Sequence, residues 1–231
     1  MKKHVAALAS LTAVVASVVV AVPAQAYDRE AYEYAAGHMV RSGDVPSILG
    51  NFGQRMTFGA SPTDGKLYIC FIKDKQVSAP GGRYAFGALF NERKGGRNLT
   101  SSVNTYESAE DAISAFETLK KEIKNCQGST TQTFTDNDGS TQTSSSLTTN
   151  GKVPMVTEVG VESVFVNQNY LETSSTGSDG YSGDNYTVFT LLNDAILSTN
   201  YNTGGSLENI PTKLRKKVNE VAFKAIGRWL G

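Results

Sequence analysis

The segment over residues 108–126 has the pattern of an α-helix, and this helix restricts the fold around it. Ser108 and Asp111 match a capping box, in which a hydroxyl caps a helix and a carboxylate follows three residues on. The apolar residues between Ala109 and Ile123 then recur at intervals of three and four, which predicts an amphipathic helix over 108–126. The apolar face of that helix has to pack against another element.

The segments on either side of this helix have the residue pattern of β-strands. Short runs rich in β-branched and aromatic residues follow Gly65 and are separated by glycine pairs or polar turns. The last two runs flank Asn193-Asp194, which predicts a tight hairpin of two core strands. The predicted strands are Lys66–Ile72, Arg83–Phe90, Asn98–Tyr106, Tyr186–Leu192 and Ala195–Tyr201.

Helical patterns recur at both ends of the strand region. Arg29–Val40 places its apolar residues on one face and is followed by a turn, and Pro211 opens a final helix whose apolar stripe extends to Trp229. Strands linked by hairpins and separated by helices indicate an α+β fold. We therefore predict a single domain with a mainly antiparallel sheet, packed by an N-terminal helix, the 108–126 helix and a C-terminal helix.

Residues 128–151 are rich in Thr and Ser and allow two interpretations. The low apolar content is typical of a disordered linker or loop. Thr131, Thr133 and Thr135, however, alternate before Asp138-Gly139, and Asp-Gly is a turn signal that favours a solvated hairpin.

The first 26 residues have the order of a secretory signal. Lys2 and Lys3 form a cationic start, an apolar run covers Val5–Val22, and Pro23 is followed by the small residues of Ala24-Gln25-Ala26. We predict cleavage between Ala26 and Tyr27, with residues 27–231 as a secreted domain and no retained transmembrane span. The alternative is an uncleaved anchor, because the apolar run nearly reaches the roughly 20 residues that a spanning helix needs.

Export changes how the charges and the cysteines are interpreted. The chain has 22 Lys and Arg against 22 Asp and Glu, so loss of Lys2 and Lys3 leaves a net charge of −2 and no strong field for nucleic acid. Cys70 and Cys126 are the two cysteines, and outside the cytoplasm such a pair usually forms a disulfide. Loop-closure entropy alone would then stabilise the fold by about 4 kcal/mol. Two buried free thiols are the alternative.

No catalytic set, cofactor motif or metal site is predicted from the residues. His38 is the one histidine of the predicted mature chain, and a lone histidine beside Met39 is typical of packing. Asp136–Gly139 has part of a calcium-loop pattern, and Asp179, Asp184 and Asn185 form a second polar group. We interpret both groups as hydrated turns. A secreted hydrolase that uses His38 with a carboxylate or a serine remains an alternative function.

Features from Cys70 to the C-terminus resemble the PknH-like extracellular sensor-domain family of actinobacteria. The resemblance rests on Val103–Ala112 with the helix that ends in Cys126, on the late hairpin around Asn193-Asp194, and on the helix over 214–229. Ile123 stands where many members have Trp, and the chain has two cysteines where many have four. The resemblance implies a Cys70–Cys126 disulfide, a mixed sheet-and-helix domain and a cleft for an unidentified ligand. It implies no catalytic residue.

These observations predict a secreted, non-enzymatic ligand-binding or sensor-like domain. Its expected partners are a small molecule or a cell-envelope ligand, and a membrane receptor could relay the signal. An adhesion or structural protein of the cell surface, with residues 128–151 as its contact, is the alternative from another class.

Overall fold

The computed structural model describes most of the chain after the predicted signal, so the cleavage site at Ala26 and Tyr27 lies outside the described residues. The described residues are 29–62, 67–70, 75–77, 82–93, 96–135, 139, 141–153, 161–174, 182–204 and 210–231. Within some of the strands, only the backbone is described.

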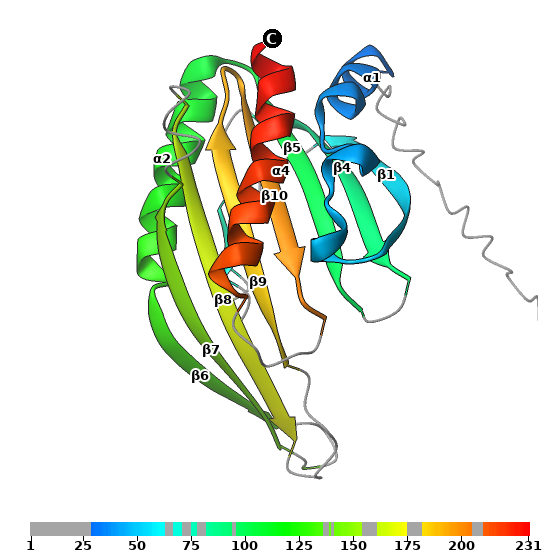
Figure 1. Cartoon of the computed structure of the whole chain (residues 1–231). Helices are drawn as coiled ribbons and strands as arrows, with labels where there is room; N and C mark the ends of the chain where they lie inside the picture. The colour runs from blue at the N-terminus through cyan, green and yellow to red at the C-terminus, as the bar shows by residue number, and fades with distance from the viewer. Residues whose placement is uncertain are drawn as a thin grey trace, which may run out of the picture.

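A single antiparallel sheet organises the described part of the chain (Figure 1). Its eight strands lie in the order β1-β4-β5-β10-β9-β8-β7-β6, and β2 and β3 form a separate two-stranded hairpin. The strands of the large sheet are β1 (Phe52–Pro62), β4 (Gly82–Glu92), β5 (Asn98–Tyr106), β6 (Gly128–Thr135), β7 (Thr141–Lys152), β8 (Ser163–Ser174), β9 (Ser182–Leu191) and β10 (Ala195–Asn202). The hairpin consists of β2 (Leu67–Cys70) and β3 (Lys75–Val77).

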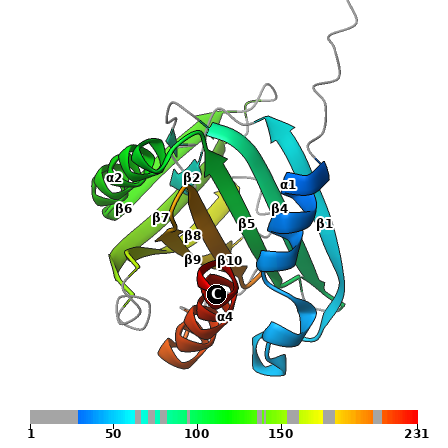
Figure 2. The same cartoon turned by 90° about the horizontal axis from the view of Figure 1, so that it is seen from above.

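Helices cover both faces of the sheet (Figure 2). α1 contacts β4 and β1, and α4 contacts β10, β9 and α1, whereas α2 lies on the opposite face. The helices are α1 (Arg29–His38), α2 (Ala109–Asn125) and α4 (Thr212–Leu230), with the short 3₁₀ turns η1 (Ser42–Asp44) and η2 (Ser47–Leu49) after α1. The predicted α+β architecture is therefore confirmed.

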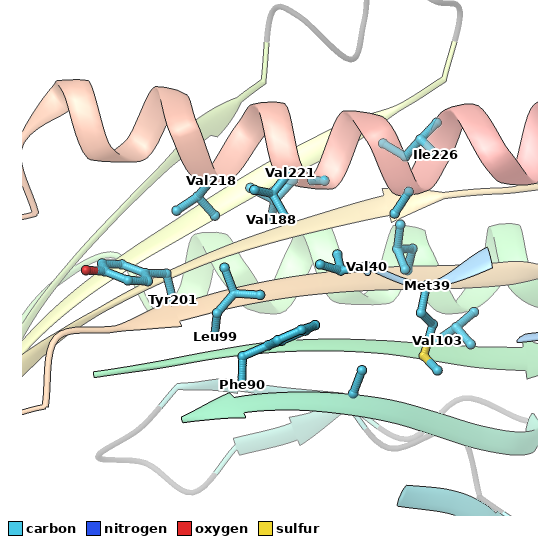
Figure 3. Close-up of a cluster of buried hydrophobic side chains, with 14 of the residues drawn as sticks. Met39, Val40, Phe90, Leu99, Val103, Val188, Tyr201, Val218, Val221 and Ile226 are labelled. Atoms are coloured by element: carbon cyan, nitrogen blue, oxygen red, sulfur yellow. The ribbon is translucent and has the colours of Figure 1, made fainter. Parts of the chain in front are cut away.

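Alternation along the central strands creates a separate hydrophobic core on each face. In β10, Ile196 belongs to the cluster under α2, while its neighbours Ala195 and Leu197 belong to the cluster under α4. This division follows from the two-residue period of a strand, which sends successive side chains to opposite faces. Figure 3 shows the α4 cluster, where Val218, Val221 and Ile226 of the helix meet residues of the sheet.

The helix predicted over 108–126 forms as α2, with Ser108 as its N-cap. The Ser108 hydroxyl accepts a hydrogen bond from the Asp111 N–H at 3.1 Å and donates one to the Asp111 carboxylate at 2.8 Å. A capping box predicts that this carboxylate accepts a hydrogen bond from the backbone N–H of Ser108. In the structure it accepts one from the Ser108 hydroxyl instead. Ala112, Phe116, Leu119 and Ile123 of the predicted apolar face are buried, together with Ala115, whereas Ile113 of that face is exposed.

Both hairpin predictions are confirmed. β9 and β10 pair antiparallel around Asn193-Asp194. The Thr/Ser-rich segment forms β6 and β7, and Gly139 between them has φ +83°, which glycine adopts without a steric penalty. The interpretation of 128–151 as a linker is therefore wrong, because β6 pairs in register with β7 over its whole length.

Three boundaries differ from the sequence-based expectations. β1 begins at Phe52, although strands were expected only after Gly65, because glycines and Pro62 obscure its alternation and its pairing with β4 contains register shifts. Asp184 and Asn185, interpreted from the sequence as part of a hydrated turn, lie in a strand, since β9 begins at Ser182. Pro211 is the N-cap of α4, one position before the first helical residue.

No helix within the described ranges is both long and apolar enough to cross a membrane.

Candidate ligand-binding site

A cavity of about 460 Å³ opens between α2 and the adjacent ends of β7 and β8. We call it the α2 pocket. The helix contributes Glu117, Lys120, Lys121, Ile123 and Lys124 to its lining. The strand side contributes Asn150, Gly151, Lys152, Glu162 and Val164.

Helical and strand periodicities together bring these side chains to one place. In α2 the spacing of three and four residues puts Glu117, Lys120 and Lys124 on one side of the helix. In β7, Asn150 and Lys152 share a face of the strand, and Lys152 pairs in register with Val164 of β8. The Asn150 side chain donates a hydrogen bond from Nδ2 to the Ile123 carbonyl at 3.2 Å, which joins the last turn of α2 to the sheet.

Lys120 connects the two sides of the pocket. Its Nζ lies 2.5 Å from the Glu117 carboxylate and 2.6 Å from the Glu162 carboxylate, and 5.5 Å from the centre of the Phe116 ring. Burial lowers the pKa of the Lys120 ammonium, but the hydrogen bonds to Glu117 and Glu162 outweigh burial and hold this pKa above its ordinary value. Lys120 therefore stays charged and ties the helix to the segment before β8.

The lining combines apolar side chains with charged ones, and its charged groups are lysines and glutamates. Ile123 and Val164 supply an apolar floor, and the charged groups lie around them. An apolar floor with a few polar groups is the usual composition of a small-molecule site.

His38 does not reach the α2 pocket. Its Nδ1 lies 2.6 Å from the Tyr34 carbonyl oxygen, and its ring centre lies 4.1 Å from that of Tyr34 and 5.3 Å from that of Trp229. It makes no hydrogen bond to a serine or carboxylate within the described part of the chain. His38 is thus a packed residue between α1 and α4, as its position beside Met39 predicts, and its geometry does not support the hydrolase alternative.

Of the aspartates considered as calcium ligands, only Asp184 lies within the described residues. Asp136, Asp138 and Asp179 lie outside the described residues, whereas Asp184 is in β9 with 1% of its surface exposed. One Asp184 oxygen accepts a hydrogen bond from Asn169 and the other accepts one from the Ile210 N–H at 2.5 Å. Asp184 therefore attaches the start of α4 to the sheet, a structural role that the hydrated-turn interpretation missed because the turn proved to be a strand.

The Asp184 carboxyl should make stability depend on pH. Burial raises its pKa to about 6 from an ordinary value of 3.8, against the opposing hydrogen bond from Ile210 and the charge of Arg215. The native state then binds more protons than the unfolded state between pH 4 and 6, so the free energy of unfolding falls as pH rises through that window, by about 2 kcal/mol. Chemical denaturation at several pH values measures this change.

Replacement of Asp184 by asparagine should remove this dependence. The amide of the new asparagine can donate a hydrogen bond to Asn169. The Asn169 amide can then turn toward Asn167, whose buried Oδ1 has no hydrogen-bond partner among the described residues. Asp194→Asn is the matched control, since Asp194 is exposed in the β9–β10 turn. An unchanged pH profile in Asp184→Asn would contradict this assignment.

The two cysteines lie on neighbouring elements. Cys126 is the C-cap of α2 with 5% of its surface exposed, and α2 contacts β2, the strand that ends at Cys70. The Cys70 side chain lies outside the described side chains. None of the described cysteines is a free thiol.

Sequence reasoning did not identify the α2 pocket. Lysines in the last turn of a helix are accounted for by the helix dipole alone, and no sequence pattern pointed to Asn150, Lys152 or Glu162. The alternation in β7 could have placed Asn150 and Lys152 on one face, but nothing in the sequence shows that this face meets α2.

The chain is similar in fold to the extracellular domain of PknH from Mycobacterium tuberculosis, with a TM-score of 0.52 and 13% sequence identity. The match covers 85% of this chain and 96% of that chain. No family model and no curated protein sequence matches this chain. The resemblance to the PknH-like extracellular sensor domains, inferred from the order of sequence features, is therefore confirmed at the level of the fold.

Proposed function

We propose that this chain is an exported, non-enzymatic ligand-binding domain of the sensor type, which acts outside the cytoplasm with its ligand in the α2 pocket. The observation that carries the proposal is the pocket itself, a cavity of about 460 Å³ with an apolar floor in a fold shared with the PknH extracellular domain. The secretory signal pattern in residues 1–26 supports the location. A soluble cell-envelope fragment or another small molecule is the expected ligand, and a membrane receptor would relay its binding.

A thermal-shift screen of the mature chain tests this proposal. A ligand that binds only the native state at a hundredfold excess over Kd adds about 2.7 kcal/mol to the free energy of unfolding, which is several degrees in Tm for a chain of this size. The library should contain cell-wall fragments, lipids below their micellar concentration and small metabolites.

Two matched phenylalanine variants locate the site. Val164→Phe fills the floor of the α2 pocket, whereas Ile113→Phe enlarges an exposed residue of α2 outside the pocket lining. A stabilising ligand should lose at least about tenfold in affinity with Val164→Phe and keep its affinity with Ile113→Phe, since overpacking excludes the ligand at only one position. The proposal fails if no library member stabilises the chain, or if every stabilising ligand binds both variants equally.

We also propose that Cys70 and Cys126 form a disulfide in the exported protein. The contact between α2 and β2 and the burial of Cys126 support this pairing. Intact mass of the secreted protein, with and without reduction before alkylation, should show one disulfide and an N-terminus at Tyr27. Two thiols that alkylate without reduction would rule out the disulfide, and retention of residues 1–26 would rule out cleavage.

A further inference from the structure

The charges that line the α2 pocket do not balance. Four lysines face two glutamates in the lining, and Lys120 forms ion pairs with both glutamates. The other three lysines are exposed and form no ion pair with a described residue. They are Lys121, Lys124 and Lys152. The pocket therefore carries an excess of positive charge in a chain whose net charge is 0 over its full length.

The helix dipole explains only part of this arrangement. Cations near the C-terminus of α2 offset the partial negative charge of its last carbonyls, which accounts for Lys121 and Lys124. Lys152 comes from β7, across the pocket from the helix, and the dipole of α2 gives no reason for its position.

The carbonyls at the end of α2 are also occupied by hydrogen bonds. The Ile123 carbonyl accepts from Asn150 and from the Cys126 N–H, and the Lys124 carbonyl accepts from the Gln127 N–H at 3.2 Å. These bonds satisfy backbone acceptors that would otherwise attract the lysine side chains. The ammonium groups therefore remain available to a ligand.

The floor of the same pocket is apolar, through Ile123 and Val164. We propose that the α2 pocket binds a ligand with an anionic group, a phosphate or a carboxylate, carried on an apolar body. The lysines of the two walls hold the anionic group, and the floor covers the apolar part. This inference rests on the proposed function and adds the chemical class of the ligand.

Octyl phosphate is the probe, and inorganic phosphate and the neutral octyl glucoside are the comparison ligands. Binding is measured from the amide spectrum of the ¹⁵N-labelled mature chain. Octyl phosphate should shift the amides of Ile123, Gly151 and Val164 saturably, and its affinity should fall as NaCl increases because salt screens exposed charges. Inorganic phosphate should bind the same residues more weakly, whereas octyl glucoside should not compete. Equal affinity for inorganic phosphate would show that the apolar body contributes nothing.

Charge variants of the lining should change the affinity for octyl phosphate in opposite directions. Lys124→Gln with Lys152→Gln should weaken octyl phosphate binding by about tenfold, because each exposed ionic contact contributes only modestly. Glu162→Gln should strengthen binding severalfold, since it removes one of the two carboxylates paired with Lys120 and makes the lining more positive. The matched control is Lys213→Gln with Lys216→Gln, which removes two exposed lysines from α4 and should change nothing.

The outcomes separate this inference from the proposed function. No saturable shift with octyl phosphate, or binding that the lysine variants do not weaken, would overturn the anionic class. If octyl glucoside or a neutral library ligand occupied the pocket instead, the proposed function would stand and the anionic class would fall. If the library screen found no ligand at all and octyl phosphate did not bind, both would fall.

Discussion

Replacement of Gly204 by alanine is expected to lower the free energy of unfolding by about 4 kcal/mol, the sum of a backbone cost and a steric cost. Gly204 follows β10 with φ +62°, in the left-handed region that side chains disfavour. A Cβ at this position would lie 2.1 Å from the Gly96 carbonyl oxygen and 2.8 Å from the Arg97 nitrogen. Both atoms belong to the backbone of the β4–β5 connection, so the clash cannot be relieved by rotation of a side chain.

Gly139→Ala is the control for this prediction. Gly139 has φ +83°, but a Cβ there would meet nothing within 4 Å, so only the backbone cost of about 1 kcal/mol applies. Urea denaturation of the two variants measures the difference. Equal losses would mean that the close approach between Gly204 and Gly96 does not limit stability.

Arg228→Met is expected to lower the free energy of unfolding by about 3 kcal/mol, because it leaves a largely buried carboxylate without its partner. Arg228 in α4 binds Asp44 through two hydrogen bonds, of 2.5 Å and 3.3 Å, and donates a third to the Met39 carbonyl at 2.8 Å. The Arg228 and Asp44 side chains are 21% and 12% exposed. This contact holds the segment after α1 against the C-terminal helix, beside the fully buried Met39 and Val40.

The control for Arg228 lies on the same helix. Lys217→Met breaks the ion pair with Glu220, which has a length of 2.7 Å but is more exposed, and should cost less than about 1 kcal/mol. Thermal denaturation should therefore lower Tm by about 10 °C for Arg228→Met and by little for Lys217→Met. Similar shifts for both variants would refute a special role for the contact with Asp44.

The same ion pair has a pH signature opposite to that of Asp184. Burial raises the pKa of the Asp44 carboxyl, but hydrogen bonds from the Arg228 guanidinium and the Arg41 N–H outweigh burial and hold the pKa below its ordinary value of 3.8. The stability that Asp44 contributes is therefore complete above pH 4 and is lost as pH falls through the lowered pKa. Arg228→Met should weaken this loss in acid.

Sequence reasoning succeeded where local interactions decide the structure. The helix from Ser108, the β9–β10 hairpin and the stripe of α4 follow from caps, turns and periodicity, which act over a few residues. It missed β1 because that strand owes its structure to pairing with β4, about thirty residues away. It placed Asp184 in a hydrated turn for a similar reason, since the partners that bury it come from β8 and from the start of α4.

The amino-acid sequence by itself determined the export signal pattern, the α+β class and the resemblance that the fold comparison supports, because these depend on local composition and on the order of elements. Only the tertiary structure decided which residues line the α2 pocket. Residues of α2 between 117 and 124 line one cavity with residues 150–152, 162 and 164 because α2 crosses the ends of β7 and β8, and this juxtaposition depends on contacts between distant segments. Lys152 and Glu162 contribute to the site only through this arrangement, since the electrostatic potential in a pocket is set by all the charges that surround it.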